Sequence, residues 1–194
     1  MPRDFGRIIA VGLWTFALSA ALSYVSGSAA GNLNLWFSVA VLVAIIATGI
    51  LFDIVGTAAA AASEAPINAM AANRVYGANQ ALRLVRNSPA VASICNDVVG
   101  DICGTVSGAV GATIILRITV ASGGWIAGYA SVLVIALISS VTVAGKAVGK
   151  RIAIESANEV ILSAGRVIAT YEKLTGQSKA SGARKRNDGR AHRD

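Results

Sequence analysis

Residues 33–62 read LNLWFSVAVLVAIIATGILFDIVGTAAAAA, and Asp53 is the only charged residue among them. A helix needs roughly 20 mostly apolar residues to cross the hydrocarbon core of a bilayer, which is about 30 Å thick. This stretch therefore predicts a membrane span. Three further stretches also qualify, at residues 8–25, 90–118 and 125–144. The expected fold class is all-α, a polytopic membrane helix bundle with about four transmembrane helices plus amphipathic cytosolic helices.

The composition supports a membrane protein and argues against several soluble classes. The chain has 194 residues, of which 55% are hydrophobic and 14% charged, whereas about 25% of the residues of a typical soluble domain are charged. The net charge is +7, but most of the basic residues flank the apolar stretches or lie in the tail. A soluble enzyme, a nucleic-acid-binding domain and a disulfide scaffold are therefore disfavoured.

Few side chains are suited to catalysis or to a soft metal site. Cys95 and Cys103 lie in an apolar run, and two such cysteines form neither a disulfide framework nor a zinc site. We expect both to be packing residues. His192, the only histidine, falls in the polar tail. Because the sequence offers no set of nucleophile, histidine and acid, we expect no enzymatic activity.

The distribution of Lys and Arg predicts the topology, because cytoplasmic loops of membrane proteins carry the basic excess. Arg3 and Arg7 precede the first span, and basic clusters follow the second and fourth spans, whereas residues 26–32 and 119–124 carry no Lys or Arg. We expect four crossings of the cell inner membrane with both termini in the cytoplasm. The open alternative is that the N-terminal span is a cleaved signal peptide, which would leave three spans.

The chain divides into four segments. Residues 1–32 hold the N-terminal span and outer loop, 33–149 the transmembrane core, 150–174 a juxtamembrane amphipathic helix and 175–194 a disordered basic tail. Within the core, residues 66–87 are amphipathic and basic, and we expect a helix there along the membrane surface or in the cytosol. The tail predicts attraction to anionic lipid. It does not predict nucleic-acid binding, because no aromatic residue is interleaved with its charges.

The third span carries the most informative polar residues. Asp97, Asp101 and Thr105 follow one another at intervals of four, and Ser93 precedes them at the same interval. Because residues four apart lie on one face of a helix, these side chains are expected to form a polar stripe. Ionisable groups inside a span are costly and usually mark a site, a pathway or an internal ion pair.

Glycines of the same span predict close helix packing on the neighbouring face. They also recur every four residues, at Gly100, Gly104 and Gly108. Small residues at this spacing let another membrane helix approach closely. We expect the protein to form a homodimer through this face.

Charged residues of two other spans can lie at the same depth as the acids. Asp53 and Lys146 reach the inner half of the membrane together with Asp97 and Asp101, given a rise of about 1.5 Å per residue. Three interpretations stay open, and one of them is small-molecule transport. Oxygen ligands of this kind suit a divalent cation such as Mg²⁺, or else Asp97 or Asp101 pairs with Lys146 and fixes the helix packing.

We also expect a bend or break of the second span near Gly56 or the alanine run, because this span is longer than a bilayer requires.

At these residues the chain resembles the transmembrane domain of the CorB/CorC and cyclin M (CNNM) family of magnesium and cobalt transport or efflux proteins. The resemblance runs from about Leu35 to Leu174. Ser63-Glu64 is similar to a Ser-Glu pair of that family, and ANRVYGANQALRLVRNSP (72–89) is similar to its basic amphipathic helix. Residues 99–105 resemble its Gly-Asn…Asn segment. GKAVGK (145–150), followed by IAIESANEVI, resembles its Gly-Glu-x-x-Pro-Lys motif and juxtamembrane helix.

The resemblance implies a cation held in the membrane by serine, asparagine and glutamate oxygens. It implies Ser63 as a ligand, with Asp101 and Thr105 at the asparagine positions and Lys146 at the glutamate position. The family's CBS domains follow the membrane domain, and the resemblance ends before them.

These observations predict a divalent-cation (Mg²⁺/Co²⁺) transporter-like or cation-binding membrane protein. The expected metal ligands are Ser63, Asp97, Asp101 and Thr105, and Lys146 is the expected counter-charge. Mg²⁺ is the one cofactor expected, and the lipid bilayer is the expected surrounding partner. The alternative is a non-transporting membrane scaffold or interaction subunit with internal Asp-Lys ion pairs.

Overall fold

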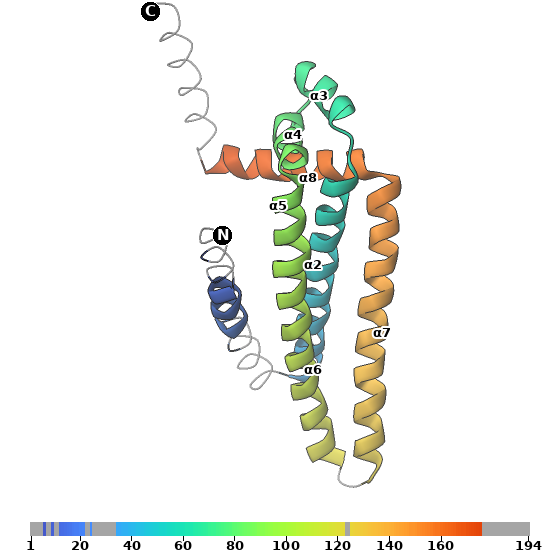
Figure 1. Ribbon diagram of the computed structural model, residues 1–194. Helices are drawn as coiled ribbons and strands as arrows, with labels where there is room; N and C mark the ends of the chain where they lie inside the picture. The colour runs from blue at the N-terminus through green and yellow to red at the C-terminus, as the bar shows by residue number, and fades with distance from the viewer. Residues whose placement is uncertain are drawn as a thin grey trace, which may run out of the picture.

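The computed structural model describes Gly6, Ile9, residues 12–21, Tyr24, 34–122 and 125–175. These residues are almost entirely helical and include no β-strand (Figure 1). The predictions for the outer loop and for the basic tail, including Arg3, Arg7 and His192, lie outside the described residues. Of the predicted first span, the main described part is the apolar helix Gly12–Ala21. That helix is shorter than the roughly 20 residues that a crossing needs.

Among the residues that the structure describes, three helices are long and apolar enough to cross a membrane, and they lie side by side in Figure 1. The first is α2 (Leu35–Ala61), the second runs over Ser88–Val120, and the third, Ser131–Glu155, is most of α7 (Trp125–Glu155). The prediction of an all-helical fold is thereby confirmed for the described residues, which include three helices that could span a membrane by length and composition.

α2 is continuous through Gly56, so no break of the helix occurs at that glycine. The alanine run that follows consists of the strongest helix formers, and the helix continues until the N–H of Ala62 donates to the carbonyl of Ala58 at 2.8 Å. Ala62 itself is extended, with φ −69° and ψ 142°. The break that the sequence predicted therefore falls at Ala62, the last residue of the alanine run.

The second membrane-length helix changes its winding along its length. It begins as α5 (Ser88–Ala92), continues as the π-helical segment η1 (Ser93–Val99) and becomes α6 (Gly100–Ser122). Pro89 lies in its first turn, where the missing N–H is tolerated because those groups have no partner within the helix. π-helical segments are rare and often occur at functional sites. This segment lies where the sequence places Asp97.

α7 continues past the predicted end at residue 144 and stops at Glu155. The chain turns at Ser156 (φ −122°, ψ 37°), and α8 (Ala157–Leu174) then crosses the end of the bundle (Figure 1). The predicted helix at 150–174 therefore begins seven residues later than expected. Neither Gly nor Pro interrupts residues 150–155, and Arg151 pairs with Glu155 at 2.7 Å across one turn, so the longer helix is favoured locally.

The centre of the bundle is the contact of α2 with α6 and α7. The side chains buried between α2 and α6 are aliphatic, namely Leu42, Ile102, Val106, Val110 and Ile114. Glycines bring α7 close to α2, because a Cβ at Gly149 would lie 2.7 Å from the Ile54 side chain. Small residues at a membrane helix interface permit such an approach.

The predicted amphipathic helix at 66–87 is two helices, α3 (Glu64–Ala72) and α4 (Ala78–Arg86). The turn between them contains two residues with left-handed backbone, Arg74 at φ 57° and Gly77 at φ 82°. A left-handed residue cannot continue a right-handed helix, which separates the two.

Helices α3, α4 and α8 form a layer at one end of the bundle, which we call the end layer (Figure 1). Its interior is apolar and contains Ile67, Ala81 and Ile161, all fully buried. α4 and α8 approach so closely that a Cβ at Gly165 would meet the backbone nitrogen of Ala81 at 2.7 Å. Ion pairs lie at the layer's surface, among them Arg86 with Glu64 at 2.7 Å and Arg83 with Glu172 at 2.8 Å.

Candidate membrane-embedded polar site

Asp53 is the buried charged side chain of the membrane bundle. It lies on α2 between the contacts with α6 and with α7, and only 4% of its surface is exposed. Its Oδ2 atom is buried and has no hydrogen-bond partner. A carboxylate in this state costs several kcal/mol or more when it is ionised and unpaired. A hydrogen-bond donor or a positive charge beside Asp53 would therefore be stabilising.

Asn96 supplies a second buried oxygen beside the same part of α2. Its Oδ1 atom is also buried and unpartnered. The amide lies against the bare backbone of Gly56, because a Cβ at that glycine would overlap Asn96 Oδ1 and would lie 2.9 Å from Cβ of Cys95. Asp53 and Gly56 are three residues apart, so they are neighbours on one face of α2. The two unpartnered oxygens therefore belong to one region of the helix interface.

Lys146 on α7 brings a positive charge to the start of α6, which follows the segment that contains Asn96. Its Nζ atom lies 3.8 Å from the place of a Cβ on Gly100, the first residue of α6. The side chain is half-buried. No ion pair within 4.0 Å joins it to Asp53, Asp97 or Asp101. We call Asp53, Asn96 and Lys146 the polar centre.

The predicted ligands of the third span do not belong to the polar centre. Asp97, Asp101 and Thr105 are exposed, whereas Ile102 and Val106 of the same helix are buried in the contact with α2. The Thr105 hydroxyl donates to the Asp101 carbonyl at 2.9 Å. The structure therefore aligns these three residues on one outer face, as the spacing predicted, and keeps them apart from Asp53. The alternative pairing of Asp97 or Asp101 with Lys146 is not formed within 4.0 Å, because the acids face outward.

Ser63 is separated from the other predicted ligands. It follows the end of α2, and its backbone N–H donates to Oδ1 of Asn158 on α8 at 3.0 Å. Together with Glu155 and Glu159 it lines a polar cavity of about 310 Å³ at the junction of α7 and α8. No group of three or more His, Cys, Asp or Glu side chains suited to a metal ion occurs among the described residues.

The predicted packing glycines also divide between two environments. Gly100 is buried beside the carbonyl of Cys95 and Lys146 Nζ, whereas a Cβ at Gly104 or Gly108 would meet no atom within 4 Å. Within one chain, the close helix contacts use other glycines, such as Gly49 against Cys103. The face that carries Gly104 and Gly108 is open.

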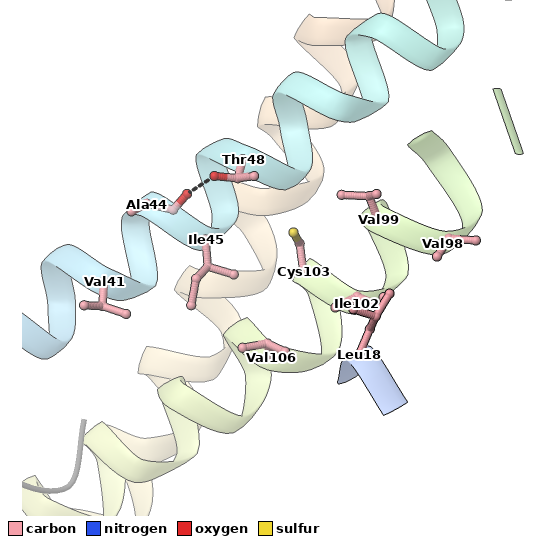
Figure 2. Close-up of a pocket in the computed structure, with 10 residues that line it drawn as sticks. All are labelled: Leu18, Val41, Ala44, Ile45, Thr48, Val98, Val99, Ile102, Cys103 and Val106. Atoms are coloured by element: carbon pink, nitrogen blue, oxygen red, sulfur yellow. Dashed lines mark hydrogen bonds between the residues drawn. The ribbon is translucent and has the colours of Figure 1, made fainter. Parts of the chain in front are cut away.

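A cavity of about 430 Å³ lies between α2 and α6 (Figure 2). Its walls are aliphatic side chains such as Val41, Ile45 and Val106, with Leu18 from the N-terminal helix closing one side. The Thr48 hydroxyl is used by its own helix, since it donates to the Ala44 carbonyl at 2.8 Å. Apart from the Cys103 thiol, the cavity therefore offers no free polar side chain, and the polar centre is the better candidate site for a cation that prefers oxygen ligands.

Asn96 is the candidate site residue that the sequence did not single out as a ligand. An α-helical spacing places it on the glycine face, and it directly precedes Asp97, the more conspicuous acid. The available signal was that Asn96 is the one amide in the run SICNDVVGDICGTVSG.

No family model, curated protein or solved structure matches this chain.

Proposed function

We propose that the protein is an integral membrane protein that binds a divalent cation at the polar centre, as part of Mg²⁺ or Co²⁺ transport. The observation that carries this proposal is the pair of buried oxygens, Asp53 Oδ2 and Asn96 Oδ1, neither of which has a hydrogen-bond partner. Both atoms are hard oxygen ligands. Mg²⁺ commonly takes one or two such protein ligands and keeps several waters, so two protein oxygens suffice for a partly hydrated ion.

Lys146 supplies the other part of the proposal. Its ammonium and a bound cation would compete for the same negative charge, because one carboxylate within a bundle of low dielectric constant can balance one positive neighbour well and two poorly. Lysine has a long flexible stem, so its ammonium can approach Asp53 when the cation leaves. Cation binding is then an exchange, in which the ion replaces the Lys146 ammonium beside Asp53.

The test is Mg²⁺-dependent thermal stabilisation of the purified protein in detergent. A ligand at ten times its Kd stabilises the folded state by about 1.4 kcal/mol. Asp53→Asn should abolish the Mg²⁺ response, and Lys146→Met should lower the concentration needed for it. Asp101→Asn is the matched control, because it removes an exposed carboxylate of a neighbouring helix and should leave the response intact.

The outcomes separate the two ligand sets. Loss of the response in Asp101→Asn with retention in Asp53→Asn would move the site to the outer face of α6 and contradict the proposal. No response of the wild-type protein to Mg²⁺ or Co²⁺ at millimolar concentrations would contradict it as well. Transport itself would be tested by Co²⁺ uptake into proteoliposomes with the same variants.

A second candidate function, a self-associating membrane scaffold, is favoured by the outer face of α6. This face exposes Asp97 and Asp101 on a membrane-length helix, where contact with lipid is costly, and it includes the open glycines Gly104 and Gly108. A second copy would cover it. Energy transfer between differently labelled copies in liposomes should then fall in the Gly104→Leu, Gly108→Leu double variant and not in Val132→Leu, an exposed change on α7.

A further inference from the structure

Helix α8 presents two distinct faces. One is buried against α4, where Gly165 approaches the Gly77 carbonyl and the Ala81 backbone. The opposite side carries an apolar stripe, because Val167 and Leu174 lie about 160–180° around the helix from Gly165, given 3.6 residues per turn. Tyr171 joins this stripe one turn after Val167.

The stripe is unusually exposed for its composition. The exposed fractions are 70% for Val167, 66% for Tyr171 and 81% for Leu174. In a soluble environment three large apolar side chains in one row would remain in contact with water, which is unfavourable by the hydrophobic effect. No described part of the chain buries them. Something outside the described residues must cover this row.

The orientation of α8 indicates what covers it. α8 crosses the ends of the membrane-length helices at a steep angle, and α3 lies beyond it at that end of the bundle (Figure 1). A helix perpendicular to membrane spans lies in the plane of the membrane surface. Lys150 and Arg151 are exposed on α7 within two turns of the start of α8, and basic residues near the end of a span extend to the headgroup region.

The charges of α8 agree with a lipid surface. Arg166 and Lys173 are exposed on the edge between the stripe and the end-layer side of the helix, and the acid Glu159 is exposed on the same edge nearer the start of α8. A helix with an apolar row and basic residues along its border is typical of interfacial helices, which bury the apolar row at the boundary of headgroups and acyl chains. Its basic residues are attracted to anionic headgroups.

We infer that α8 is an interfacial helix, whose Val167–Tyr171–Leu174 stripe inserts into a membrane leaflet containing anionic lipid. α4 covers the side of α8 opposite to the stripe and shields that side from water. The end layer is thereby anchored to the bilayer independently of any cation in the polar centre.

The experiment places a fluorophore on single cysteines of the full chain in a Cys95→Ala, Cys103→Ala background. The protein is reconstituted in nanodiscs of phosphatidylcholine and phosphatidylglycerol. One label replaces Tyr171, and the matched control replaces Asn79, which is exposed on α4. Lipids with a nitroxide near the headgroup and aqueous iodide are the two quenchers.

The label at Tyr171 should lose most of its fluorescence to the nitroxide lipid and little to iodide, and the label at Asn79 should do the reverse. Quenching of both labels mainly by iodide would overturn the inference. So would a label at Tyr171 shielded from both quenchers, because a protein surface would then cover the stripe. If the labelled variants fold poorly, Leu174→Ser with the label at Val167 repeats the measurement on the same row.

Discussion

Gly165→Ala tests the close contact of α4 with α8. A Cβ at this position would overlap the Gly77 carbonyl oxygen and would lie 2.7 Å from N and 2.9 Å from Cβ of Ala81. Carbon atoms pack at about 3.5–4.0 Å, so α4 must move by about 1 Å. The new Cβ would overlap backbone atoms and the Cβ of Ala81, so no rotation of a flexible side chain can relieve the overlap.

The expected loss in free energy of unfolding is estimated relative to a matched control, Gly104→Ala. Replacing glycine by alanine within a helix is worth about 1 kcal/mol of helix propensity, and Gly104→Ala receives the same gain without meeting any atom within 4 Å. Alanine is also small enough for close helix contacts. Overpacking costs about 1–3 kcal/mol, so Gly165→Ala should unfold at a free energy about 1–3 kcal/mol lower than Gly104→Ala. At about 2–4 °C per kcal/mol, its Tm should be about 2–12 °C lower.

The assay is thermal unfolding in detergent followed by circular dichroism, together with amide hydrogen exchange. Exchange should accelerate over Ala78–Arg86 and Ala157–Leu174 in Gly165→Ala and remain at the wild-type rate in Gly104→Ala. Equal Tm values for the two variants, with unchanged exchange in α4 and α8, would refute the close approach of these helices.

Three further predictions concern the interior, the polar centre and the surface. Ile161→Ala removes a fully buried side chain of the end layer and should lower the free energy of unfolding by about 2–5 kcal/mol, measured by denaturant titration. Gly56→Ala should displace the Asn96 amide, whose Oδ1 lies where the new Cβ would be, and should weaken Mg²⁺ stabilisation more than it lowers Tm. The Gln80 amide, and in second place the Arg83 guanidinium, hold the pKa of Glu172 below its ordinary value of 4.5. The resulting stability is present above pH 4.5 and lost as the pH falls through the lowered pKa, so Glu172→Gln should flatten the acid side of the stability profile by at most about 1 kcal/mol, the value of an exposed ion pair.

The sequence predicts the membrane helices well because their signal is local. Length and hydropathy alone identify α2 and the helices that include residues 90–118 and 125–144. The boundaries are less certain, since Lys146 and Lys150 indicate a membrane edge but not the end of a helix. α7 continues past both lysines to Glu155, because nothing in those residues breaks a helix.

The polar centre is harder to predict, because it depends on how helices rotate against one another. A spacing of four correctly places Asp97, Asp101 and Thr105 on one face, yet it does not tell which face meets α2. Asn96, one residue before Asp97, belongs to the π-helical segment at Ser93–Val99 and lies against Gly56. Neither the π-helical winding nor the face that meets α2 has a clear signal in a single sequence.

The most direct measurement is a double-mutant cycle on Mg²⁺ affinity with Asp53→Ala, Asn96→Ala and the double variant, because two ligands of one ion act non-additively. If Asp53 Oδ2 and Asn96 Oδ1 hold the same cation, each single variant should lose most of the affinity, and the double variant should lose little more. Wild-type affinity in Asp53→Ala, or losses in the two single variants that simply add, would contradict a shared site in the membrane bundle.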